Sequence, residues 1–132
     1  MRNALKLTAA FACLAALAGC NLSSCGNEVS QSIPSPSGAL KAVVFNRNCG
    51  ATTGFNIQVS IVPANGEFPN DGGNTLIIDG SAPLKVQWRS DSALHLAGLG
   101  AARVFKQEDS VAGVTVDYST KLRPNNSFKP TR

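Results

Sequence analysis

Apolar and polar residues alternate along much of the chain after its first 20 residues, and the clearest run is 55–61. In an extended chain successive side chains point to opposite faces, so this run places its apolar residues on one face and its polar residues on the other. A helix would scatter the same apolar residues around its circumference, and the pattern therefore predicts a half-buried β-strand. The apolar residues are Phe55, Ile57, Val59 and Ile61, and the polar ones are Asn56, Gln58 and Ser60.

The first predicted strand of the chain is 39–47. Three apolar residues stand at consecutive positions within it, Val43, Val44 and Phe45, and this indicates burial on both faces. The segment 63–74 contains two prolines and three glycines, so it predicts a long exposed connection.

Shorter alternating runs predict the remaining strands. A hairpin is predicted over 84–97, around the turn Ser90-Asp91-Ser92 and with Trp88 in the core, and a last hairpin is predicted across Glu108-Asp109-Ser110. The sum is about six or seven short strands, and the sequential hairpins favour a meander. We therefore expect an all-β domain built as a small antiparallel sandwich or an open barrel. The remaining predicted strands are 75–79, 84–89, 93–97, 103–107 and 111–120.

The first 19 residues follow a different pattern, which is typical of a secretory signal. Arg2 and Lys6 precede an uncharged, mainly apolar run from Leu7 to Leu17, and small residues follow that run. The run is shorter than the roughly 20 residues that span a bilayer, which argues against a transmembrane helix. An ordinary secretory signal without lipid is the alternative interpretation.

The residues at the end of this signal, Leu17-Ala18-Gly19-Cys20, resemble the lipobox of bacterial lipoproteins. The resemblance implies that residues 1–19 are a lipoprotein signal peptide, that the chain is cut before Cys20, and that Cys20 carries acyl chains such as palmitate. Several acyl chains make a stable anchor where one chain does not. The implied location is the cell envelope, lipid-anchored and facing the periplasm. In that family, Asn21 in place of Asp favours the outer membrane over the inner membrane.

The mature chain, 20–132, has the size of a single domain. Residues 20–38 are polar and rich in serine and predict a tether, residues 39–122 predict the β domain, and residues 123–132 predict a disordered tail. Within the tail, Asn-Asn-Ser-Phe-Lys-Pro-Thr resembles the ends of proteins from integron gene cassettes. That resemblance implies translated recombination-site DNA, and the alternative is an ordinary polar terminus.

The basic charge of the protein belongs to its ends. The chain has 12 Lys and Arg against 8 Asp and Glu, but two of the basic residues lie in the signal and two lie in 125–132. The body between these ends is neutral and has no cluster of basic residues interleaved with aromatic ones, which argues against nucleic-acid binding. We expect no cofactor.

Cysteine use points to one disulfide. Cys13 leaves with the signal and Cys20 is assigned to lipid, so Cys25 and Cys49 remain. Exported proteins fold in an oxidising compartment, and we predict a Cys25–Cys49 disulfide, with two free thiols as the alternative. Two cysteines and the single His95 do not supply the four ligands of a structural metal site.

The loop Cys49–Phe55 is the candidate ligand loop. Together with the flanking residues 42–45 and 58–61, it resembles a segment of small uncharacterised bacterial proteins, a family that implies no activity. The hydroxyls of Thr52 and Thr53, with the glycine amides, suit a small polar ligand. The favoured interpretation is nevertheless a disulfide-fixed connection whose glycines adopt positive φ.

These observations favour a membrane-anchored cell-envelope lipoprotein that acts by binding or scaffolding and is not an enzyme, with an envelope protein as its partner. The alternative is a periplasmic inhibitor or accessory subunit that acts by adding a strand to a partner. A small hydrolase using His95 is the third hypothesis. His95 is expected to be half exposed, Asp91 and Ser92 are neighbours only in sequence, and catalysis requires an acid and a hydroxyl within hydrogen-bond reach.

Overall fold

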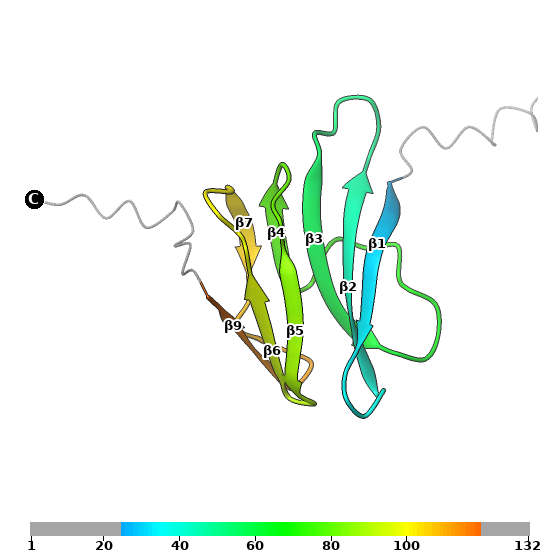
Figure 1. The fold of residues 1–132 in the computed structure, drawn as a ribbon. Coiled ribbons are helices and arrows are strands. Elements are labelled where there is room, and N and C mark those ends of the chain that lie inside the picture. The colour runs from blue at the N-terminus through cyan, green and yellow to red at the C-terminus, as the bar shows by residue number, and fades with distance from the viewer. Residues whose placement is uncertain (1–24, 120–132) are drawn as a thin grey trace, which may run out of the picture.

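Two β-sheets pack against each other in the computed structural model, which describes residues 25–119 (Figure 1). The five-stranded sheet has the order β1-β2-β3-β4-β7, and the four-stranded sheet has the order β5-β6-β9-β8. No helix occurs in 25–119, and the two open sheets form a sandwich and not a closed barrel. The prediction of a small all-β domain is therefore confirmed. The strands are β1 (Gly26–Pro34), β2 (Leu40–Asn48), β3 (Asn56–Pro63), β4 (Leu76–Asp79), β5 (Lys85–Ser90), β6 (Ala93–Ala97), β7 (Val104–Gln107), β8 (Ser110–Val111) and β9 (Val114–Tyr118).

The main core lies between the two sheets. Each sheet contributes the apolar residues that its strands place at every second position, as the alternation predicts. Trp88 was expected in the core, and it is half-buried there against these residues. The buried members are Ala42, Val44, Val59, Ile61, Leu76, Ile78, Leu84, Leu94, Leu96, Leu99, Val104, Val114 and Val116.

The segment between β3 and β4 covers the outer face of the five-stranded sheet. Phe68 packs edge-on against Phe45, with 5.0 Å between the ring centroids, and this pair forms a second apolar cluster with Val43 and Val62. The predicted exposed connection over 63–74 is exposed over most of its length, but Phe68 and Gly73 pack against the sheet. A Cβ at Gly73 would lie 2.8 Å from the carbonyl oxygen of Leu76, so only glycine allows this close approach to the sheet.

Side-chain amides continue the strand ladder beneath this segment. Asn74 accepts a hydrogen bond from the Ile61 amide and donates one to the Ile61 carbonyl, each at 2.8 Å. Gln58 accepts from the Gly73 amide at 2.7 Å. The polar face of β3 was expected to be exposed, but Gln58 and Ser60 are buried because the segment covers them.

Residues 26–34 form β1, so the prediction of a tether over 20–38 is wrong for that stretch. β1 pairs with β2 in antiparallel register, from Gly26 opposite Asn48 to Pro34 opposite Lys41. Most of its side chains are exposed because it is an edge strand with one neighbour, and its serine-rich composition matches that position. The predicted signal peptide at 1–19, Cys20 and the predicted tail at 123–132 lie outside the described residues.

The predicted hairpin over 84–97 is confirmed as the antiparallel pair β5–β6. The predicted last hairpin is wrong, because β7 pairs with β4 in one sheet and β9 pairs in parallel with β6 in the other. The chain changes sheet at 108–109, and the turn at Ala112-Gly113 separates β8 from β9. With β1 and β8 added, the described residues hold nine strands and not six or seven.

Replacing Asn74 with alanine should lower the free energy of unfolding by about 1–3 kcal/mol. The change leaves the buried amide and carbonyl of Ile61 without partners. Urea unfolding followed by circular dichroism measures the effect. The matched control is Asn65→Ala in the same segment, where the side chain is exposed, and we expect a change within about 0.5 kcal/mol. Equal losses for the two variants would contradict the role given to Asn74.

Tyr118, the single tyrosine, donates a hydrogen bond to the Glu108 carbonyl at 2.7 Å. Burial raises its pKa above the usual range, and the charges of Asp109 and Glu108 add to the shift. In the unfolded chain the phenol has a pKa of about 10. The neutral, buried phenol therefore stabilises the folded state below about pH 10, and this contribution is lost as the pH rises further, because only the unfolded chain readily loses the proton. Absorbance titration should therefore show phenolate at higher pH in buffer than in urea. Identical midpoints would contradict the burial of this hydroxyl.

Candidate functional site

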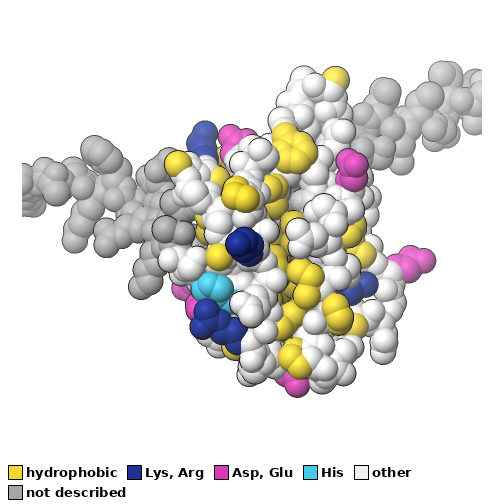
Figure 2. All heavy atoms as spheres, viewed as in Figure 1, with side chains coloured by type: hydrophobic (Ala, Val, Ile, Leu, Met, Phe, Trp, Pro, Cys, Tyr) yellow, Lys and Arg dark blue, Asp and Glu magenta, His cyan; other side chains and the backbone are white. Residues whose placement is uncertain are grey.

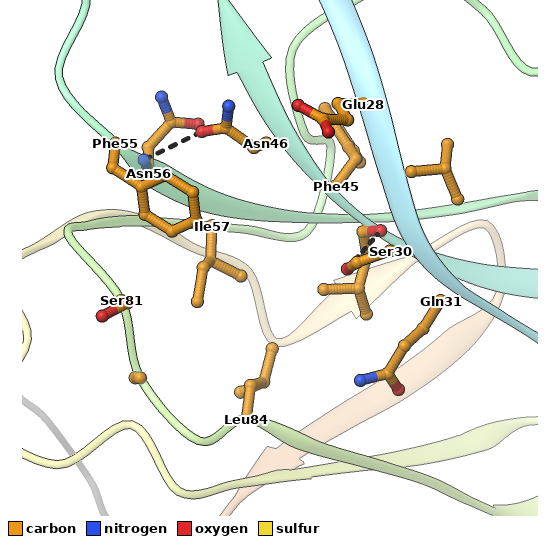
Figure 3. A pocket seen from close by; sticks show the side chains of 13 residues that line it. Glu28, Ser30, Gln31, Phe45, Asn46, Phe55, Asn56, Ile57, Ser81 and Leu84 are labelled. Atoms are coloured by element: carbon orange, nitrogen blue, oxygen red, sulfur yellow. Dashed lines mark hydrogen bonds between the residues drawn. The ribbon is translucent and has the colours of Figure 1, made fainter.

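A hollow of about 510 Å³ opens on one side of the sandwich (Figure 3). Its walls come from β1, β2, the start of β3 and the loop before β5. Its volume falls within the roughly 300–1,000 Å³ range of ligand-binding pockets. The lining residues are Glu28, Val29, Ser30, Gln31, Val44, Phe45, Asn46, Phe55, Asn56, Ile57, Ser81, Ala82 and Leu84.

One exposed aromatic side chain, Phe55, lies at this hollow. The large apolar residues that the described chain exposes are Val29 at 48%, Phe55 at 58% and Phe105 at 58%. Phe105 stacks under the guanidinium of Arg103, whose Cζ lies 5.0 Å from the ring centroid. Val29 is paired with Phe45 and shares its outer face of the sheet, whereas Phe55 lines the hollow beside Ile57 and Leu84. Apolar side chains that meet at a concave surface are typical of a binding site.

Polar side chains also line the hollow. The side chains of Glu28, Gln31 and Ser81 have no hydrogen-bond partner within 25–119, whereas Asn46 accepts from the Asn56 amide at 3.0 Å (Figure 3). Gln31 therefore offers both a donor and an acceptor, and Glu28 offers acceptors. The hollow thus combines an apolar floor with polar groups available to a bound molecule.

Cross-links hold the β1 wall of the hollow. Cys25 and Cys49 lie at disulfide-bonding distance, with 4.0 Å between their Cα atoms, and they join the start of β1 to the end of β2. Arg47 donates to the Asn27 side chain at 2.7 Å. At the other end of β1, the Trp88 indole donates to the Ile33 carbonyl at 2.9 Å and ties β1 to β5. Polar contacts at both ends therefore position a strand that buries little apolar surface.

The loop before β5 approaches the chain closely at Gly98. This residue has φ +84°, and a side chain there would collide with the Pro83 carbonyl. Glycine is therefore required where the loop that carries Ala82 and Leu84 meets the end of β6.

The two threonines of the candidate ligand loop do not reach the hollow. Both are exposed, and the Thr53 hydroxyl accepts a hydrogen bond from the Cys49 amide at 3.1 Å. Gly50 has φ +123°, which agrees with the interpretation of a glycine-dependent connection. From this loop only Phe55 lines the hollow. Sequence reasoning missed Phe55 because its place in the alternating run indicated burial.

His95 pairs with Asp117 on the outer face of the four-stranded sheet. The parallel register of β6 and β9 places the two residues opposite each other, and Nδ1 lies 3.0 Å from the carboxylate. The His95 side chain is only 14% exposed, less than the expected half, and Asp117 is 54% exposed. Within 25–119 the carboxylate is the imidazole's hydrogen-bond partner, and the ring has no hydrogen bond to a hydroxyl there. Asp91 instead accepts from the Ser37 amide at 2.7 Å.

Replacing Cys25 and Cys49 together with serine should lower the free energy of unfolding by roughly 3 kcal/mol, because the unfolded chain gains the freedom of an open loop. Amide hydrogen exchange should also accelerate in the first half of β1, where little apolar packing replaces the cross-link. Reductant should have the same effect on the unchanged protein and no effect on the double variant. A reductant response in the variant would show that another group is responsible.

Comparison with known proteins identifies no relative. No protein-family model, no curated protein and no solved structure matches the chain. In residues 25–119 no three His, Cys, Asp or Glu side chains gather as a metal site would require. The same range contains no helix with the length and apolar character needed to cross a bilayer. Function is therefore inferred from the hollow and from the chemistry of its walls.

Proposed function

We propose that this protein is a lipid-anchored cell-envelope protein that binds a partner protein through the hollow beside β1. The observation that carries the proposal is the position of Phe55, an exposed aromatic side chain that lies beside the apolar residues Ile57 and Leu84 at a concave surface of about 510 Å³. A partner that covers them removes apolar area from water, which is the main favourable term in protein association.

The polar groups of the hollow favour a protein as the occupant. Gln31 and Glu28 are free to bond within the described chain, and an amide side chain matches the donor and acceptor of a peptide unit. The lining supplies one carboxylate and no histidine, so it suits recognition better than acid–base chemistry.

The short stretch of sequence between Cys20 and β1 supports a binding site close to the proposed anchor. Four residues separate Cys20 from Cys25, and five backbone steps span about 18 Å at full extension. Because Cys25 is joined to the end of β2, the greatest distance between Cys20 and the folded domain is this same span. A partner would therefore be engaged next to the membrane surface, not at the end of a long tether.

The anchor is tested with the full chain expressed in a Gram-negative host. We expect the membrane fraction to hold a chain whose intact mass corresponds to 20–132 plus acyl chains, and Cys20→Ala to lose both the acyl mass and the membrane retention. Cys25→Ser is the control, because it removes a cysteine outside the lipobox. An unacylated wild-type chain would refute the anchor.

The hollow is tested in the same cells with a photo-crosslinking residue at Phe55. The control position is Thr115, an exposed residue on the outer face of the four-stranded sheet. We expect one crosslinked partner from position 55, joined through one mapped peptide, and none from position 115. Equal or absent crosslinking at the two positions would refute binding through the hollow.

A further inference from the structure

The edge of the four-stranded sheet lies beside the hollow. β5 pairs with β6 on one side and has no strand on its other side among the described residues. Leu84, which directly precedes β5, lines the hollow, and Trp88 within β5 reaches across to Ile33 of β1. The free side of β5 therefore faces the inner surface of β1 and β2.

The two sheets do not match in extent. Five strands face four, and Figure 1 shows no strand of the smaller sheet in front of β1 and β2. The inward residues of β5, Val86 and Trp88, remain half-buried although they pack on the core. One strand added beside β5 would cover them and would place five strands opposite five.

We propose that the hollow receives an extended segment of a partner protein, which adds to the free edge of β5 as a fifth strand of the smaller sheet. This proposal rests on the proposed function and names the partner's chemistry. The added strand directs apolar residues inward against Val44, Ile57 and Leu84. Its backbone bonds to β5, as in other cases of strand addition.

The basic side chains of β5 favour acidic residues at the outward positions of the added segment. Lys85 and Arg89 are exposed at the two ends of the strand, where Arg89 occupies a β-bulge. The carboxylates nearby are already engaged: Asp91 bonds the Ser37 amide and Asp117 bonds His95. Opposite charges on paired strands attract, so the outward residues of the added strand are acidic. Figure 2 shows basic side chains beside the column of hydrophobic ones on this face.

The same charges disfavour a second copy of this chain as the occupant. Antiparallel pairing of two β5 edges around Gln87 would place Lys85 of each copy opposite Arg89 of the other. Like charges on directly paired strands are destabilising, and basic residues at an edge are a common protection against self-pairing. A partner with alternating apolar and acidic residues meets no such barrier. Glu28 lies on the opposite wall, where it faces the inward side of the segment.

The proposal is tested with a synthetic eight-residue peptide that alternates valine and glutamate. The full chain is held in phospholipid nanodiscs, and the emission of Trp88, the single tryptophan, reports binding. The matched peptide alternates valine and lysine, and we expect it to bind roughly five- to tenfold more weakly. In Lys85→Glu/Arg89→Glu this preference should reverse. Arg103→Glu is the control, because Arg103 directly precedes β7, an edge strand of the five-stranded sheet. This change should leave the preference for the glutamate peptide unchanged.

Backbone pairing is tested separately, by N-methylating all valines in one peptide and all glutamates in another. These two sets of amides point to opposite edges of an extended strand. We expect one pattern to weaken binding by about tenfold or more and the other to leave it intact.

Equal effects of the two methylation patterns, or no reversal in the charge variant, would overturn strand addition, and so would the absence of any peptide binding. Concentration-dependent dimers would overturn it in favour of a second copy. A Trp88 response to the lipid alone would overturn it in favour of an acyl chain. Crosslinking from position 55 would survive a failure of the peptides and would leave the proposed function standing, whereas failure of both would remove the two together.

Discussion

Burial of β2 and β3 on both faces is the constraint on which the rest of the structure depends. The inner faces pack against the smaller sheet, and the outer faces need a cover as well. The 64–74 segment supplies it with Phe68, and the backbone beneath it must find partners without water. Asn74 and Gln58 provide them by taking the place of a neighbouring strand's amides and carbonyls. A loop rich in proline and glycine thereby covers part of the outer face of the sheet.

β1 has the opposite character. It is polar, exposed and paired on one side, so apolar burial contributes little to holding it in place. The Cys25–Cys49 link and the Trp88 contact take over this role at its two ends. A strand held in this way can form one wall of a hollow without filling it. It also replaces most of the expected tether, so that few residues separate the domain from Cys20, the proposed lipid site.

The hollow results from the unequal extent of the two sheets. Where β5 is the edge strand, apolar residues of the larger sheet have no opposing strand, and Phe55 stands at the opening. The 64–74 segment covers the outer face of the larger sheet, and the Trp88 indole and the Cys25–Cys49 link hold the two ends of β1. The region beside the free edge of β5 stays uncovered, and a further strand fits there. Binding and strand addition, two separate hypotheses from the sequence, thus converge on one surface. The His95–Asp117 pair lies on another face and is accounted for by its parallel strand register.

Local periodicity by itself determined the all-β class, the strand at 55–61 and the hairpin over 84–97, because alternation and turn residues are short-range signals. The cysteine count, together with the expectation of export, was enough to predict the pairing of Cys25 with Cys49. Only the tertiary structure decided that the serine-rich 26–34 is a strand, because an exposed edge strand needs no apolar pattern of its own. It also decided that β9 pairs in parallel with β6, since pairing between distant segments leaves no local trace. The exposure of Phe55 depends on where the smaller sheet ends. The residues near Phe55 in sequence do not determine the position of that edge, so the local pattern could not predict it.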